Sequence, residues 1–171
     1  MSIEIRKATV DDAADVARIH IHSWQETYRG MMPQAYLDSL DLERRITNWT
    51  MHLQNPDAFE VNIATVGGKA YGIAAAGKCR DKDLDYQGEI FLIYVLQEAK
   101  GKGLGRMLMR AMKETMLRQG IHNAALWVLD VNPARRFYEH MGAKQLQSKE
   151  VELAGTTLVE VAYGFDNFDV Y

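Results

Sequence analysis

Cysteine is almost absent from the sequence, and this excludes a disulfide framework. Cys79 is the only cysteine among 171 residues, so no disulfide can form within the chain. It follows a predicted strand and has no obvious histidine partner, so a cysteine nucleophile is not expected. A chain without internal disulfides is typical of the reducing cytoplasm, which is the predicted location.

Long apolar runs and an excess of basic charge are also missing. No run approaches the roughly 20 apolar residues that a membrane-spanning helix needs, and the first residues lack the apolar core of a signal peptide. The formal net charge is −3, so the chain has no overall basic field to attract nucleic acid or a membrane surface. We expect neither as a partner.

Proline and clustered metal ligands are scarce as well. The chain has only three prolines and no low-complexity stretch, so we expect one domain over residues 1–171 with no linker. His20 and His22 are two positions apart and point in different directions on a helix. His52, His122 and His140 have no ligand spacing, so no metal site is predicted.

The alternation of apolar and polar residues predicts an α/β domain with a mixed central sheet. Gly67-Gly68 and Ala154-Gly155 are two-residue turn signals between strands. Residues 88–96 are almost continuously apolar, which favours burial on both faces. The predicted strands cover residues 3–7, 59–66, 70–78, 88–96, 124–129, 145–153 and 157–163, and the predicted helices cover 13–28, a short segment from 33, 42–53, 104–119 and 133–141.

Three alternating glycines separate the apolar strand at 88–96 from the following helix. The first N–H groups of a helix have no internal partner and carry partial positive charge, so they form an anion site. Glycine lets a phosphate approach the backbone closely. The segment that supplies these groups consists of Lys100, Gly101, Lys102, Gly103, Leu104, Gly105 and Arg106. It predicts a ligand that carries a pyrophosphate.

Two other glycine-rich phosphate sites do not fit this segment. A Walker loop needs G-x-x-x-x-G-K followed by Ser or Thr, and no such run occurs. A dinucleotide fingerprint needs a third glycine or alanine where Arg106 or Leu108 stands here.

The run K-G-K-G-L-G at residues 100–105 resembles the Q/R-x-x-G-x-G/A acyl-CoA motif of the GCN5-related N-acetyltransferase family. Lys100 stands where Gln or Arg is usual. Residues 126–143, L-W-V-L-D-V-N-P-A-R-R-F-Y-E-H-M-G-A, are similar to the next strand and helix of that family, with Asn132, Phe137, Tyr138 and Gly142 in matching places. The two motifs occur in the right order, so the resemblance is specific over residues 89–143.

The resemblance implies a GNAT-like mixed central β-sheet flanked by helices on both faces. It implies direct transfer of an acetyl group from acetyl-CoA to an amine in a ternary complex. The implied acetyl-CoA contacts are Tyr94, Val95, the segment from Lys100 to Arg106, Asn132 and Tyr138. A backbone N–H of Val95 or Leu96 is the expected donor to the oxyanion.

Tyr138 is the predicted acid, because a phenol keeps its proton at neutral pH and can protonate the departing thiolate. Its alternative role is to pack on the sheet beside Phe137. Glu89 is the predicted base for the attacking amine, with a solvated strand end as its alternative. Asp85 and Tyr86 are weaker candidates.

The amine acceptor is not identified by the sequence and is either a small molecule or a peptide. Trp24 and Tyr28 share a helix face and, with Tyr36, either shape the acceptor cleft or belong to the core. The acidic residues Asp11, Asp12, Asp15 and Glu26 either attract a cationic acceptor such as a polyamine or form a solvated face.

Two other hypotheses are a non-catalytic acyl-CoA-binding or sensing domain and an oligomer-interface module. Aromatic residues in the tail, residues 165–171, suggest a partner surface, and a homodimer is expected.

Overall fold

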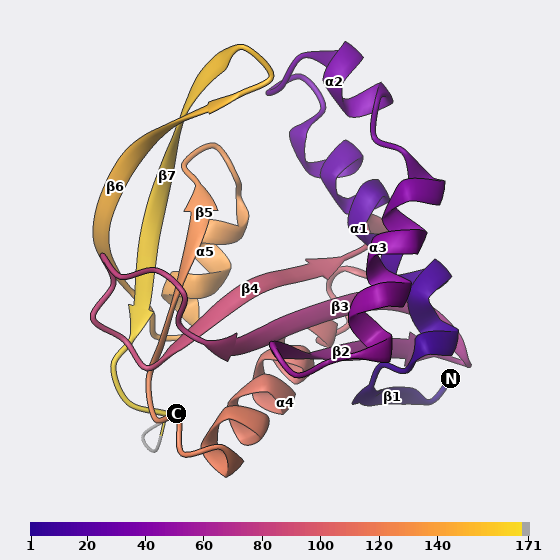
Figure 1. Cartoon of the computed structure of the whole chain (residues 1–171), viewed down its shortest axis with the longest axis horizontal. Helices are drawn as coiled ribbons and strands as arrows, with labels where there is room; N and C mark the ends of the chain where they lie inside the picture. The colour runs from indigo at the N-terminus through magenta and orange to yellow at the C-terminus, as the bar shows by residue number, and fades with distance from the viewer. Residues whose placement is uncertain (169–171) are drawn as a thin grey trace.

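The computed structural model describes residues 1–168. Seven strands form one sheet in the order β1-β2-β3-β4-β5-β7-β6, as seen in Figure 1. Neighbouring strands are antiparallel except β4 and β5, which are parallel. The elements are β1 (Ile3–Lys7), η1 (Val10–Asp12), α1 (Ala13–Tyr28), α2 (Gln34–Asp38), α3 (Leu42–Gln54), β2 (Phe59–Val66), β3 (Lys69–Lys78), β4 (Gly88–Val95), η2 (Gln97–Ala99), α4 (Leu104–Arg118), β5 (Ala124–Leu129), α5 (Ala134–His140), β6 (Lys144–Leu153) and β7 (Thr156–Phe165).

Helices cover both faces of the sheet, which confirms the predicted fold class. Val16 and Ile19 of α1 pack with Trp49 of α3 against β2 and β3. On the other face, Leu108 and Met112 of α4 lie in a second core cluster. Both helices place apolar residues at the three- and four-residue spacing that makes one buried face.

Strands β4 and β5 separate soon after they begin. They pair only at Gly88 with Ala124 and at Glu89 with Ala125, and Figure 1 shows the two strands diverging from there. From Ile90 to Val95 one edge of β4 therefore has no strand beside it. The prediction that this strand is buried on both faces is wrong, because most of its residues are only half-buried along the open edge.

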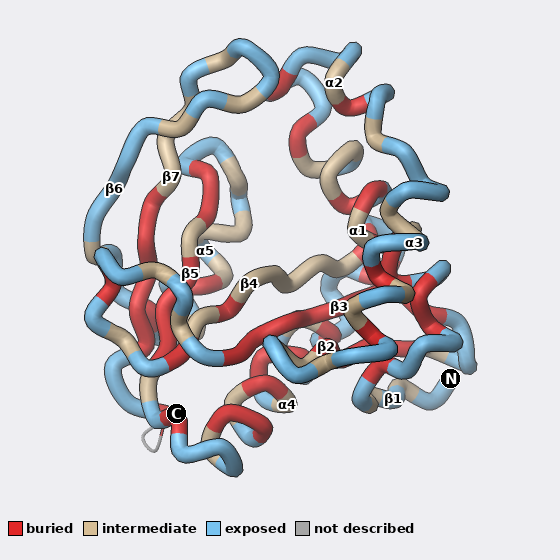
Figure 2. The backbone as a smooth tube through the Cα atoms, in the orientation of Figure 1, coloured by how far each residue is buried: buried red, intermediate tan, exposed pale blue. Residues whose placement is uncertain are grey.

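The long β6–β7 hairpin reaches across to the first helices. Near its tip, Leu153 and Leu158 pack against a cluster that includes Tyr28 of α1 and Leu37 of α2. Most of β6 is exposed, as Figure 2 shows. The tip of the hairpin thus joins β6 and β7 to the first two helices.

The predicted partner surface in the tail is wrong for the aromatic residues that are described. Phe165 and Phe168 are 1% and 2% exposed and belong to the main core. The N–H of Phe168 donates to the carbonyl of His122 at 2.8 Å, which holds the tail against the sheet. Tyr171 lies outside the described residues. Within residues 1–168 no helix has both the length and the apolar character to cross a membrane.

Candidate active site

The glycine segment leaves a row of backbone N–H groups free. Gly101 and Gly103 have φ of 79° and 82°, which L side chains rarely adopt. The first hydrogen bond into α4 runs from the Met107 N–H to the Gly103 carbonyl at 3.0 Å. The N–H groups of Leu104, Gly105 and Arg106 therefore have no helical partner, and no side chain caps this helix start. The segment is built to hold an anion.

A first cavity of about 430 Å³ lies between this loop, the end of β4 and the start of α5. Lys100 and Arg106 supply cationic side chains to it, whereas the exposed Lys102 does not line it. The remaining predicted acetyl-CoA contacts that line this cavity are Tyr94, Val95, Gly101, Gly103, Leu104, Gly105, Asn132 and Tyr138. Residues from three separate parts of the chain thus meet as the two sequence motifs predict.

A second cavity of about 460 Å³ lies on the other side of the opening between β4 and β5. Glu89 lines it from β4, and Trp24 and Tyr28 line it from α1. Ile93, Tyr94, Asn132 and Tyr138 line both cavities. These four residues mark the junction of the two cavities.

Hydrogen bonds fix the residues at this junction. The Trp24 Nε1–H donates to the Tyr94 hydroxyl at 2.8 Å, and Asn132 Nδ2 donates to the Tyr28 hydroxyl at 3.0 Å. The Asn132 Oδ1 accepts from the Ala134 N–H at 2.9 Å, which fixes the start of α5. The Trp24 and Tyr28 ring centroids are 4.9 Å apart, so the predicted shared face is confirmed.

Tyr138 has the surroundings expected of a neutral phenol. It is 6% exposed, and its hydroxyl has no hydrogen-bond partner among residues 1–168. Burial, with smaller effects from Tyr94 and Tyr28, raises the pKa of Tyr138 well above its usual range. Its side chain therefore stays protonated at neutral pH.

Glu89 is held by the loop that follows β3. The Arg80 N–H donates to its Oε1 at 3.0 Å, and the Arg80 guanidinium lies 3.9 Å from Oε2. Tyr94 is five positions after Glu89 along β4, and the bulge at Phe91 removes one step of the ladder, so the two are roughly 13–17 Å apart along the strand. Glu89 therefore lies in the second cavity but at a distance from the junction.

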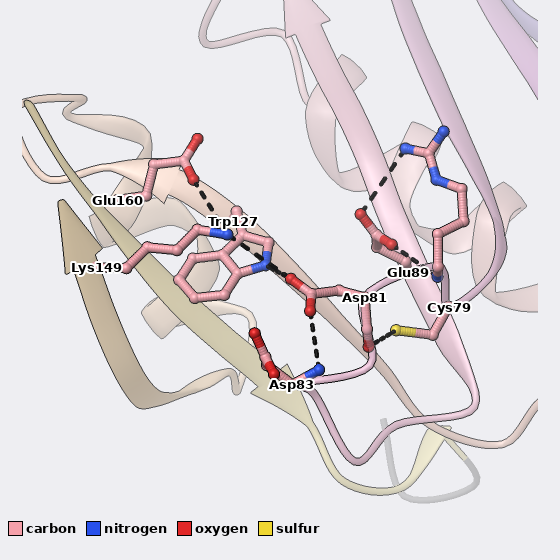
Figure 3. A network of polar contacts seen from close by, with 8 residues as sticks. Cys79, Asp81, Asp83, Glu89, Trp127, Lys149 and Glu160 are labelled. Carbon is pink, nitrogen blue, oxygen red and sulfur yellow. Dashed lines mark hydrogen bonds and ion pairs between the residues drawn. The ribbon is translucent and has the colours of Figure 1, made fainter. Parts of the chain in front are cut away.

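The same loop is also tied through Asp81 to Trp127 of β5 and Lys149 of β6, as Figure 3 shows. Asp81 accepts from the Trp127 Nε1–H at 2.8 Å. Lys149 lies 4.0 Å from the Trp127 ring centroid and 3.8 Å from Glu160. Cys79 donates to the Asp81 carbonyl, and burial raises the pKa of its thiol. A reactive thiolate is therefore not favoured here.

Several predicted residues lie away from both cavities. The Leu96 N–H donates to the Tyr71 carbonyl at 2.9 Å, so it is not free to bind an oxyanion. Of the two predicted oxyanion donors, only the Val95 N–H stays a candidate. Tyr86 donates to Asp166 at 2.6 Å, and Asp85 is exposed elsewhere in the same loop. Tyr36 packs in the cluster around Leu37.

The acidic residues near the N-terminus form contacts of their own. Asp12 accepts two hydrogen bonds of 2.8 Å from Arg6, and Asp15 pairs with Arg18. Glu26 accepts from the Gln97 N–H at 2.9 Å. None of these residues lines either cavity, nor does Asp11, so these four carboxylates do not contribute to the candidate site.

Sequence reasoning missed other residues that line the cavities. Ser23 and Thr27 of α1 line the first, and Trp127, Glu152 and Glu160 line the second. Ser23 interrupts the apolar face of α1, so the sequence alone could have indicated it. Trp127, Glu152 and Glu160 reach the second cavity through the order of the strands in the sheet, which the sequence does not show. Among the described residues no group of three or more His, Cys, Asp or Glu side chains is arranged to hold a metal ion.

Comparison with known proteins identifies the class of protein. Residues 71–151 match the family model described as FR47-like protein. An uncharacterized N-acetyltransferase of Bacillus subtilis is 30% identical over 95% of this chain and 92% of its own length. The chain belongs to the GCN5-related N-acetyltransferase family, and the prediction of an acetyl-CoA-dependent acyltransferase is confirmed at the level of the family.

Two proteins of Thermoplasma acidophilum extend the comparison. A spermidine N(1)-acetyltransferase is 26% identical over 75% of this chain and 79% of its own length. The crystal structure of PaiA N-acetyltransferase in complex with coenzyme A has a TM-score of 0.71, at 22% identity, and covers 94% of this chain and 98% of that one. This structural likeness supports the fold.

Proposed function

We propose that the protein transfers the acetyl group of acetyl-CoA directly to a small cationic primary amine. The observation that carries this proposal is the meeting of two cavities at Ile93, Tyr94, Asn132 and Tyr138. One cavity has an anion-binding loop and the other does not. Donor and acceptor can then be bound together, with the reacting atoms at the junction.

The first cavity holds the acetyl-CoA. The N–H groups that follow Gly103, together with Lys100 and Arg106, bind the pyrophosphate. The pantetheine arm pairs as an extra strand with the open edge of β4. Successive N–H groups of a strand point to opposite edges, and that of Leu96 points to β3. The Val95 N–H therefore points to the open edge, where it binds the carbonyl oxygen of the arm or the oxyanion.

Tyr138 protonates the CoA thiolate as the tetrahedral intermediate breaks down. Its raised pKa keeps the proton on the phenol until negative charge develops on the sulfur. Glu89 is too distant along β4 to take the proton of the amine by direct contact. We assign it the role of a base that acts through water in the second cavity, with Arg80 holding its carboxylate.

Charge in the second cavity favours a cationic acceptor. Glu89, Glu152 and Glu160 line it, and no lysine or arginine does. Arg80 pairs with Glu89 and Lys149 with Glu160, whereas Glu152 accepts from the Thr157 hydroxyl and has no ion pair within residues 1–168. Aromatic rings around these carboxylates also attract cations. The similarity to a spermidine acetyltransferase supports a polyamine as the acceptor.

A thiol-release assay with acetyl-CoA tests the proposal against polyamines, amino acids, aminoglycosides and peptide N-termini. We expect the highest kcat/KM with a polyamine, and a several-fold higher KM for it in Glu152→Gln. CoA binding without turnover of any amine would instead indicate a binding or sensing domain. The homodimer and the cytoplasmic location stay predictions, and sedimentation of the purified protein checks the first.

A further inference from the structure

Ser23 carries a buried hydroxyl that the folded chain does not use. The residue is 4% exposed, and its Oγ has no hydrogen-bond partner among the described residues. Buried hydroxyl groups nearly always have a partner, since leaving one unpaired costs free energy. Ser23 therefore has hydrogen-bonding capacity that something outside the chain can satisfy.

Other hydroxyls in the helices take the local route that Ser23 does not. Thr47 and Thr50 of α3 donate to the carbonyls of Glu43 and Ile46, four residues earlier, at 3.1 and 2.8 Å. Such back-bonding is the usual outcome for a helical hydroxyl. The Ser23 hydroxyl lacks this contact although it is more deeply buried than either threonine.

Ser23 is one of the residues that line the first cavity, and so is Thr27 one turn further along α1. Within residues 1–168 the other buried side-chain nitrogen or oxygen without a partner is Asn62 Nδ2 on β2, and Asn62 lines neither cavity. Tyr94 and Val95 of β4 line the cavity with Ser23, at the edge where an extended ligand can pair.

We infer that Ser23 Oγ forms a hydrogen bond with an amide of the pantetheine arm of the acyl donor. A neutral hydroxyl that can both donate and accept suits an amide, whereas the phosphates have the glycine loop, Lys100 and Arg106. The inference rests on the proposed use of the first cavity for acetyl-CoA. It adds a contact from α1, opposite the contacts from β4.

Calorimetric titration distinguishes the contribution of the pantetheine arm to binding from that of the nucleotide. CoA and 3′-phosphoadenosine 5′-diphosphate, the fragment that keeps the pyrophosphate but lacks the arm, are each titrated into the wild type, Ser23→Ala and Ser23→Cys. We expect the Kd for CoA to rise roughly three- to tenfold in both variants, the effect of one neutral hydrogen bond. The Kd for the fragment stays unchanged. Thr50→Val, which removes a hydroxyl far from the cavity, changes neither Kd.

Thermal unfolding supplies a readout that does not depend on the titration. Because the hydroxyl has no partner in the free protein, Ser23→Ala keeps or raises the Tm without ligand and shows a smaller Tm increase with saturating CoA. If the Ser23 variants bind CoA with the wild-type Kd, or if their Kd for the fragment rises as much as their Kd for CoA, the role of Ser23 is wrong but the proposed function is unaffected. Failure of the wild type to bind CoA would overturn the proposed function and this contact with it.

Discussion

Replacement of Tyr138 by Phe tests whether its phenol serves chemistry or packing. The residue is buried, but its hydroxyl is not one of the buried atoms left without a partner, so its removal leaves no hydrogen-bonding group of the protein unpaired. We therefore expect the free energy of unfolding of Tyr138→Phe to be unchanged or up to about 1 kcal/mol higher. In a domain of this size that corresponds to a Tm increase of at most roughly 2–4 °C.

The same substitution lowers the rate of acetyl transfer. General acids typically contribute about 10²–10⁴-fold. A thiolate with a pKa near 8.5 leaves readily, so we expect kcat to fall on the order of 10²-fold while the Kd for CoA is nearly unchanged. Because burial raises the pKa of Tyr138, the loss is the same throughout pH 6–9. Thiol release under saturating acetyl-CoA measures it.

Tyr163→Phe is the matched control, because its ring lies 6.5 Å from that of Tyr138. The Tyr163 hydroxyl donates to Glu139 at 2.6 Å and accepts from Arg135 at 3.0 Å. Loss of hydrogen bonds to charged groups costs roughly 1.5–3 kcal/mol, so this variant unfolds at a lower temperature with kcat nearly intact. A Tyr138→Phe variant that lost stability as Tyr163→Phe does, or kept the wild-type kcat, would refute the reasoning.

Three further predictions concern the loop and the pH dependence of stability. Gly103→Ala and Gly120→Ala each place a side chain at positive φ with no atom within 4 Å of the new Cβ. Each variant therefore loses about 1–2 kcal/mol of stability in urea unfolding. Only Gly103→Ala also weakens CoA binding in calorimetry. Burial lowers the pKa of His20 to about 4, so as the pH is lowered the unfolded chain binds a proton on this residue before the folded chain does. The free energy of unfolding therefore decreases as the pH falls from about 6.5 to 4. The same dependence of this free energy on pH in His20→Gln would contradict the prediction. The hydrogen bonds from Arg6 lower the pKa of Asp12, so their stabilisation is present above about pH 4 and is lost as the pH falls through the lower folded-state pKa. Asp12→Asn should flatten this acid limb in urea titrations.

Much of the local structure followed from short-range chemistry. Glycines 67 and 68 have φ of 58° and 83°, as a two-residue hairpin turn requires, and they join β2 to β3 as predicted. Gly120, at φ 75°, follows the end of α4. The glycine segment at residues 100–105 lies at a helix start with free N–H groups. These features depend on the backbone conformation of a few adjacent residues, so they can be predicted from the sequence.

Contacts between distant segments were not readable in this way. The apolar run at 88–96 indicated a fully buried strand, yet β4 loses its neighbour after Glu89 because β5 diverges from it. Glu152 and Glu160 reach the second cavity only because β7 pairs with β5 and the hairpin leans on α1 and α2. An acceptor contact was one of two alternatives for the acidic residues near the N-terminus, and Asp12 and Asp15 instead pair with Arg6 and Arg18.

The order of strands and helices and the glycine loop at residues 100–105 could be predicted, because each is encoded within a few consecutive residues. Which side chains share a cavity depended on the tertiary structure. It left the Val95 N–H at an open edge of β4, and it placed Ser23 on the first cavity without a partner among residues 1–168. The physical reason is that cavities form where strands part and helices cross, and those distances depend on packing between segments far apart in the chain.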